Sequence, residues 1–283
     1  MVVTADSIAS EVGLAVLEDG GNAVDAAVAI GFALAVVYPE AGNIGGGGFM
    51  LLRMPDGSSH SIDFRETAPR RSTPDMYAAN PNASVDGCLA PAVPGTVAGL
   101  LSALETYGTM DRAELLRPSI ELAGKGFRVN ANLAASLAEY RVALERFHYT
   151  KRIFFRDSVP LGEGALLIQQ DLGSTLRRIA DSGMAGFYSG RTAALLTSQV
   201  ASCGGILDDS DLAGYRAVFR PVLKGSYRGY EIDAMGPPSS GGICLLQALA
   251  LLERYDLRSL GFQTAPSVHL IADFIRHVHR GLL

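Results

Sequence analysis

The 283-residue sequence has no tryptophan and only three cysteines, and charged residues make up just 19% of it. The 24 Lys and Arg residues against 29 Asp and Glu give a net charge of −5, and the charges are scattered in ones and twos. A nucleic-acid-binding surface needs a basic stripe, so nucleic acid is not expected as a partner. Hydrophobic residues make up 48% of the chain, which excludes disorder as its main state and predicts a large buried core.

Long hydrophobic runs are also lacking. The longest extends over the 13 residues from Ala26 to Tyr38, and at ~1.5 Å per residue a helix of this length spans only ~20 Å, too short to cross a bilayer. It is therefore expected to be a buried helix, and no membrane span is expected. The chain opens directly on Met1 with no signal peptide pattern.

The pattern of metal-binding residue types supports no metal site. The odd number and wide spacing of Cys88, Cys203 and Cys244 favour buried thiols over a disulfide framework or a zinc site. A calcium-binding loop starting at Asp209 fails because its twelfth position is Arg220. We expect neither a metal nor a cofactor.

Two glycine-bearing segments invite functional readings. The run Gly45–Gly48 lacks the third glycine of a dinucleotide fingerprint, because Met50 stands in its place. Such a run lets the backbone pass close to a ligand or another segment, or it provides a tight entry into a buried strand. The loop Pro237–Gly242 does not fit a nucleophile elbow, and its serines are expected to cap the following helix.

Periodicity and turn residues predict a mixed helical and strand-containing chain without repeats or linkers, hence a single domain over residues 1–283. Asp6 or Ser7 is expected to cap a first helix and Asn22 a second. The other expected elements are hairpins over 49–54 with 59–65 and over 215–223 with 227–234, the latter turning at Lys224–Ser226, and helices near 130–147, 172–182, 189–202, 243–254 and 265–279.

Arg65 is the single residue most suggestive of binding. It closes a predicted strand in which Ile62 and Phe64 form a buried face, while Ser61, Asp63 and Arg65 form a polar one. A guanidinium in this position can grip a carboxylate through two parallel hydrogen bonds. The residues alone leave open whether Arg65 does this or pairs structurally with Asp63 or Glu66.

In order along the chain, five blocks resemble the gamma-glutamyltransferase family, which hydrolyses glutathione or transfers its gamma-glutamyl group. The blocks are Gly20–Ala27, Tyr38–Phe49, Asp63–Pro69, Pro94–Gly99 and Pro237–Gly242. The resemblance implies an α+β fold of the N-terminal-nucleophile hydrolase type, an α-β-β-α sandwich, of which this chain would be the large-subunit part. It also implies that Arg65 binds the α-carboxylate of the gamma-glutamyl substrate.

In the resembled family a precursor cleaves itself, and the new N-terminal threonine of a small subunit attacks the substrate amide, its own α-amino group acting as base. That threonine has no counterpart here, since Thr4 and Thr96 are internal. The resemblance therefore implies no catalytic residue in this chain, a small-subunit partner, glutathione or another gamma-glutamyl compound as substrate, and inactivity of the chain alone.

Two other functions remain open. One is an amidase similar to the cephalosporin (glutaryl) acylases of the same family, and the other is a non-catalytic remnant or binding module that keeps Arg65. The apolar ending at Gly281–Leu283 is expected to reflect a truncated C-terminus. The family resemblance suggests a periplasmic or secreted location.

Overall fold

The computed structural model describes residues 1–280, and the side chains of residues 1–278. The segment 281–283, on which the expected C-terminal truncation depends, lies outside the described residues. Two units pack separately: unit 1 combines Met1–Gly48 with Phe64–Ala217, and unit 2 combines Phe49–Asp63 with the chain from Val218 onward. Because one domain can hold more than one such unit, the single domain over 1–283 stays a prediction.

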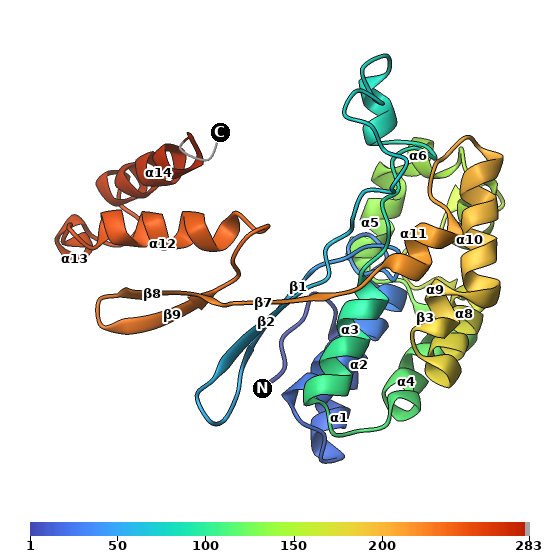
Figure 1. The fold of residues 1–283 in the computed structure, drawn as a ribbon, viewed down its shortest axis with the longest axis horizontal. Coiled ribbons are helices and arrows are strands. Elements are labelled where there is room, and N and C mark those ends of the chain that lie inside the picture. Colours follow the sequence, from blue (N-terminus) through green and yellow to red (C-terminus); the bar gives the residue numbers. More distant parts are fainter. Residues whose placement is uncertain (281–283) are drawn as a thin grey trace. The chain divides into compact units, whose positions relative to one another are not determined.

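Unit 1 is mainly helical (Figure 1). Its helices are α1 (Ser7–Glu18), α2 (Ala23–Val37), α3 (Thr96–Tyr107), α4 (Arg112–Lys125), α5 (Ala131–Glu139), α6 (Arg141–Leu144), α7 (His148–Phe154), α8 (Gln170–Ser182), α9 (Ala185–Tyr188), α10 (Gly190–Ser202) and α11 (Asp209–Gly214). A 3-10 turn, η1 (Pro81–Ser84), and the short strands β3 (Phe127–Arg128), β4 (Phe155–Arg156), β5 (Val159–Pro160) and β6 (Leu166–Leu167) connect them.

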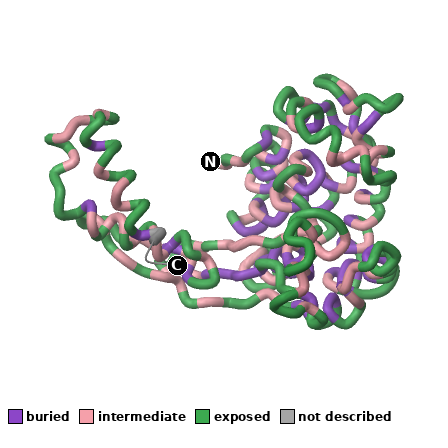
Figure 2. Tube along the Cα trace, turned by 90° about the horizontal axis from the view of Figure 1, so that it is seen from above, coloured by how far each residue is buried: buried purple, intermediate pink, exposed green. Residues whose placement is uncertain are grey.

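The apolar run forms α2, the central helix of unit 1. Its cap is Asn22, as the sequence predicts, and the Asn22 side chain accepts hydrogen bonds from the amides of Val24 and Asp25. Val28, Phe32 and Val36 are fully buried, and α2 packs against α1, α3 and α4. Figure 2 marks such buried positions in purple. A helix that is apolar on all sides requires this enclosure.

The first helix also begins as predicted, with Asp6 as its cap, and the helices expected near 172–182 and 189–202 are confirmed as α8 and α10. The helix expected over 130–147 is wrong as one element. It breaks at Tyr140 into α5 and α6, because the Tyr140 backbone leaves the helical range there.

Unit 2 contains a three-stranded antiparallel sheet and a separate hairpin, together with three helices. In the sheet, β2 (Ser59–Asp63) lies between β1 (Phe49–Arg53) and β7 (Val218–Arg220). The hairpin joins β8 (Leu223–Tyr227) to β9 (Tyr230–Ala234). The helices are α12 (Gly241–Leu252), α13 (Leu257–Leu260) and α14 (Ala265–Arg280), so the two predicted C-terminal helices are confirmed.

The predicted register of the second hairpin is wrong. Its turn is Arg228–Gly229, with φ of 50° and 85°, and not Lys224–Ser226. Two successive positive φ values fit a two-residue turn that matches the twist of the strands. Gly225, in the middle of the predicted turn, lies within β8, where a Cβ would come 2.5 Å from Leu246 on α12. Its small size serves helix packing.

The predicted polar face of β2 is also wrong, since both faces are buried. Ser61 is 1% exposed and donates a 2.9 Å hydrogen bond to the carbonyl of Arg220. The Asp63 carboxylate, also buried, accepts a 2.7 Å hydrogen bond from Nε of Arg220. Pairing with β7 supplies the polar partners that make this burial possible.

The expectation of buried thiols is wrong for two of the three cysteines. Cys88 and Cys203, with Cα atoms 5.9 Å apart, form a disulfide across 115 residues, and Cys203 is exposed. Cys244 is a free, half-buried thiol. Within residues 1–280, no helix is long and apolar enough to span a membrane.

Candidate functional site

Three of the five sequence blocks meet in unit 1 around the segment that carries Arg65. The glycine run pairs with this segment, because the amide of Gly48 donates to the carbonyl of Phe64 at 3.3 Å and the amide of Phe64 donates back at 3.0 Å. On its other side, Thr67 and Val93 form an isolated antiparallel bridge. Segments far apart in sequence thus hold the Arg65 backbone from both sides.

The glycine run is required for a close approach between chain segments. A Cβ at Gly47 would lie 2.5 Å from the carbonyl oxygen of Phe64, 2.9 Å from the amide nitrogen of Glu66 and 3.0 Å from the Cα of Arg65. These neighbours are backbone atoms and cannot rotate away. Of the roles that the sequence left open for the glycine run, the structure therefore favours a close approach to another chain segment, residues 64–66.

The start of α3 completes this arrangement. The carbonyl of Gly46 accepts hydrogen bonds from the amides of Gly95 (2.7 Å) and Thr96 (3.0 Å), so the glycine run binds the first turn of the helix. A Cβ at Gly95 would collide with the carbonyl of Phe64 and the hydroxyl of Tyr215. The Pro94–Gly99 block therefore binds the glycine run through backbone hydrogen bonds, and its Gly95 leaves room for Phe64 and Tyr215.

Two stacked tyrosines hold the Arg65 segment and the start of α3. The Tyr215 hydroxyl donates a 2.8 Å hydrogen bond to the carbonyl of Arg65, and its ring stacks on Tyr188 with centroids 5.8 Å apart. The Tyr188 hydroxyl donates to the carbonyl of Pro94 at 2.8 Å and accepts from the amide of Ala98 at 3.2 Å. Burial raises the pKa of Tyr188, so its phenol stays protonated as a donor.

Downstream, Arg70 fixes the end of the block. Its amide donates a 2.9 Å hydrogen bond to the Asp211 carboxylate, which also lies 3.4 Å from Nε of Arg70. Asp211 and Asp208 form a capping box at the start of α11, so these aspartates have structural roles. Among the described residues, no three His, Cys, Asp or Glu side chains are placed to hold a metal ion.

Arg65 itself is exposed on this fixed backbone, between the buried Phe64 and the exposed Glu66. No ion pair involves Glu66 in the part of the chain that the structure describes, so that structural pairing is not observed. Arg65 is therefore an exposed arginine on a backbone that is held at several points. Such a group can bind a carboxylate with little loss of conformational freedom.

Sequence reasoning found Arg65 and the glycine run but missed Tyr188 and Tyr215. The sequence pattern predicts that Tyr215 begins a strand, whereas it is the C-terminal cap of α11. Nothing local in the sequence indicates a contact with Arg65, because the two residues are 150 positions apart.

Comparison with known proteins gives concordant matches. The family model described as gamma-glutamyltranspeptidase matches residues 9–281. The glutathione hydrolase proenzyme of Escherichia coli (strain K12) is 43% identical over 285 residues, which cover 99% of this chain and 49% of that protein. The acylase ACY 1 proenzyme of Pseudomonas sp. (strain V22) is 39% identical, covering 98% and 51%.

Among solved structures, Helicobacter pylori gamma-glutamyltranspeptidase superposes with a TM-score of 0.96 at 43% identity, covering 99% of this chain and 82% of that one. This likeness confirms the predicted α+β fold of the N-terminal-nucleophile hydrolase type. The chain spans about half the length of the curated relatives it matches.

Proposed function

Because this chain belongs to the gamma-glutamyltranspeptidase family, we propose that the protein containing it cleaves gamma-glutamyl amides such as glutathione. The name of the Escherichia coli relative, a glutathione hydrolase proenzyme, supports this substrate class. The proenzyme label likewise supports a precursor that is cleaved into two subunits, of which this chain represents the large one.

Arg65 is proposed to bind the α-carboxylate of the gamma-glutamyl group. The observation that supports this assignment is an exposed arginine residue on a backbone fixed by Gly47, Gly48 and Tyr215. A planar guanidinium forms two parallel hydrogen bonds to a carboxylate, which fixes the orientation of the substrate as well as its position. The amide to be cleaved would then lie at a defined distance from Arg65.

The nucleophile is proposed to be a threonine of the small subunit, outside this chain. A threonine of this type uses its own α-amino group as the base and must be N-terminal. Thr96 cannot act in this way, because its nitrogen forms the peptide bond to Gly95 and is not a free amine. We therefore expect this chain alone to be inactive, and it supplies no catalytic residue.

The proposal is tested with the complete two-subunit enzyme and a gamma-glutamyl anilide. Arg65→Ala is expected to raise KM at least tenfold, because one charge-assisted pair contributes roughly 1.5–3 kcal/mol. Arg71→Ala is the matched control, since Arg71 is an exposed arginine in the same loop for which the structure describes no ion pair. An unchanged KM for Arg65→Ala would overturn the assignment.

A substrate series identifies the group that Arg65 binds. The 4-aminobutyryl anilide lacks only the α-carboxylate, so the wild-type enzyme should use it far less well than the gamma-glutamyl anilide. Arg65→Ala should remove most of this discrimination, because the interaction that produces it is gone. Equal discrimination by both enzymes would place the carboxylate on another residue.

A second candidate is an acylase acting on glutaryl amides, as in cephalosporin acylases, and the match to the acylase ACY 1 proenzyme favours it. A glutaryl group keeps the carboxylate proposed to bind Arg65 and lacks only the α-amino group. Arg65 therefore serves either substrate, and the ratio of kcat/KM for gamma-glutamyl and glutaryl anilides decides between them.

A non-catalytic remnant is the third alternative, and intact masses of the native protein decide it. A second chain that begins with threonine supports the enzyme, while its absence supports the remnant. We further propose a periplasmic or secreted location, because the Cys88–Cys203 disulfide is typical of proteins in an oxidising compartment.

A further inference from the structure

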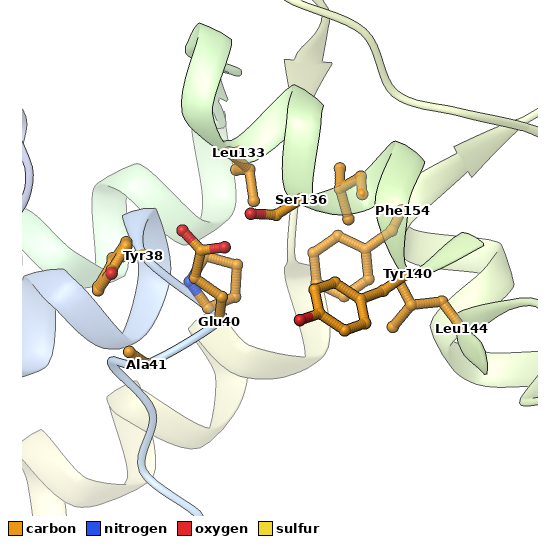
Figure 3. Close-up of a pocket in the computed structure, with 10 residues that line it drawn as sticks. Tyr38, Glu40, Ala41, Leu133, Ser136, Tyr140, Leu144 and Phe154 are labelled. Atoms are coloured by element: carbon orange, nitrogen blue, oxygen red, sulfur yellow. The ribbon is translucent and has the colours of Figure 1, made fainter. Parts of the chain in front are cut away.

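A pocket of about 500 Å³ in unit 1 is lined by the turn after α2 and by α5, α6 and α7, and it does not include Arg65. Volumes of this size are usual for sites that bind small organic molecules. Its walls are mainly apolar and aromatic, with Leu133, Leu137 and Phe154 among the lining residues (Figure 3).

Glu40 is the single charged residue among the ten that line this pocket. Figure 3 shows its carboxylate beside the Ser136 hydroxyl, with the rings of Tyr140 and Phe154 across the cavity. Within the described residues, no hydrogen bond or ion pair joins the side chains of Glu40, Ser136 or Tyr140 to another group. One negative charge and two hydroxyls thus remain available to a ligand.

The position of Glu40 is fixed by its turn. The carbonyl of Tyr38 accepts hydrogen bonds from the amides of Ala41 (3.2 Å) and Gly42 (2.7 Å), which holds Glu40 within a tight turn. A Cβ at Gly42 would lie 2.6 Å from the carbonyl of Leu34, so this turn packs directly on the end of α2. The carboxylate therefore extends from a rigid base.

We propose that this pocket binds an organic ammonium cation that carries an aromatic or aliphatic group. The Glu40 carboxylate pairs with the ammonium group, and the hydroxyl oxygens of Ser136 and Tyr140 accept hydrogen bonds from its other N–H groups. The faces of Tyr140 and Phe154 attract the cation through their ring quadrupoles and contact its apolar part. An anion of the same shape would meet an unbalanced negative charge and be rejected.

Equilibrium binding of phenethylammonium to the purified native protein tests this inference, with phenylacetate and 2-phenylethanol as shape-matched anionic and neutral probes. The expected order is phenethylammonium above 2-phenylethanol above phenylacetate, with the preference for the cation weakening as salt is added. Equal binding of all three probes, or binding of none, would overturn the inference.

Two variants assign the binding to this pocket. Glu40→Gln is expected to weaken phenethylammonium binding roughly tenfold while leaving 2-phenylethanol binding unchanged, since only the charge is lost. Glu139→Gln is the matched control, because Glu139 is an exposed residue of α5 that does not line the pocket.

Tyr140→Ala removes an exposed ring and should weaken binding of both probes, with thermal melting confirming that the variant is folded. Unchanged cation binding in Glu40→Gln would contradict the proposal.

Discussion

The hydroxyl of Tyr215 donates a 2.8 Å hydrogen bond to the backbone carbonyl of Arg65, 150 residues earlier in the chain. The bond links the end of α11 to the proposed substrate-binding arginine without involving the guanidinium. Tyr215 is therefore a positioning residue, whose effect on substrate passes through the backbone of Arg65.

Tyr215→Phe keeps the ring and its stacking on Tyr188 but leaves the Arg65 carbonyl without this donor. In the two-subunit enzyme, KM for a gamma-glutamyl anilide is expected to rise about fivefold, because one neutral hydrogen bond contributes ~1 kcal/mol. The value of kcat should change less. In an Arg65→Ala background the same substitution should leave KM unchanged, and an additive effect would contradict the positioning role.

Gly47→Ala tests the close passage of the glycine run. The added methyl group would meet three backbone atoms of residues 64–66, so we expect a loss of ~1–3 kcal/mol in the free energy of unfolding. Gly45→Ala is the control, because the nearest atom to its Cβ is Oδ1 of Asn43 at 3.6 Å. Denaturant unfolding measures both variants, and equal losses would show that general strain in the run is responsible.

Asp25 makes unit 1 sensitive to acid. Burial raises its pKa, but hydrogen bonds from Thr109, Asn22 and Met110 together outweigh burial and hold the pKa below the ordinary value of 3.8. The stabilisation is therefore complete above pH ~4 and is lost as the pH falls through the lowered pKa.

Asp25→Asn is expected to destabilise the protein by ~2–3 kcal/mol at neutral pH, because the new amide group faces donors. The difference from wild type should shrink below the pKa of Asp25. Unfolding curves recorded between neutral and acidic pH check this, with the exposed Asp19→Asn as the control. A difference that stayed constant with pH would assign the loss to packing alone.

The Cys88–Cys203 disulfide predicts a specific labelling pattern. In this chain, alkylation of the denatured, unreduced protein should modify Cys244 alone, and peptide mapping should recover residues 88 and 203 as one cross-linked species. Cys88→Ser should cost about 2–5 kcal/mol in unfolding free energy, because the bond closes a long loop in the unfolded chain. Alkylation of all three thiols without reductant would show that the bond is absent.

Local signals in the sequence predict helices such as α1, α2, α8 and α10, but they do not predict the break at Tyr140 between α5 and α6. Asn22 sits directly before an apolar run, and the cap it predicts depends only on its nearest neighbours. Arg65 stands out because it closes a strand of alternating polar and apolar residues and because a guanidinium can grip a carboxylate through two hydrogen bonds. Its proposed role came from a family resemblance, and the structure adds the contacts that fix its backbone.

Features that depend on tertiary contacts could not be predicted. Glycine is typical of turns, yet Gly225 lies in a strand, where a Cβ would lie 2.5 Å from Leu246 on a helix later in the chain. The sequence pattern predicts that Ser61 and Asp63 face solvent, because nothing near them in the sequence indicates that both hydrogen-bond to Arg220. The disulfide and the Tyr215–Arg65 hydrogen bond could not be predicted for the same reason, because each joins residues more than a hundred positions apart.

During synthesis, the middle strand of the unit 2 sheet, β2, lacks one of its two neighbouring strands for some time. The strands β1 and β2 leave the ribosome early, but Arg220, the partner of Asp63, follows 157 residues later. At a translation rate of about 5–20 residues per second, the second edge of β2 stays unpaired for roughly 8–30 s before β7 is made. An unpaired strand edge can pair with other chains, so association between nascent chains through β2 competes with folding during that interval.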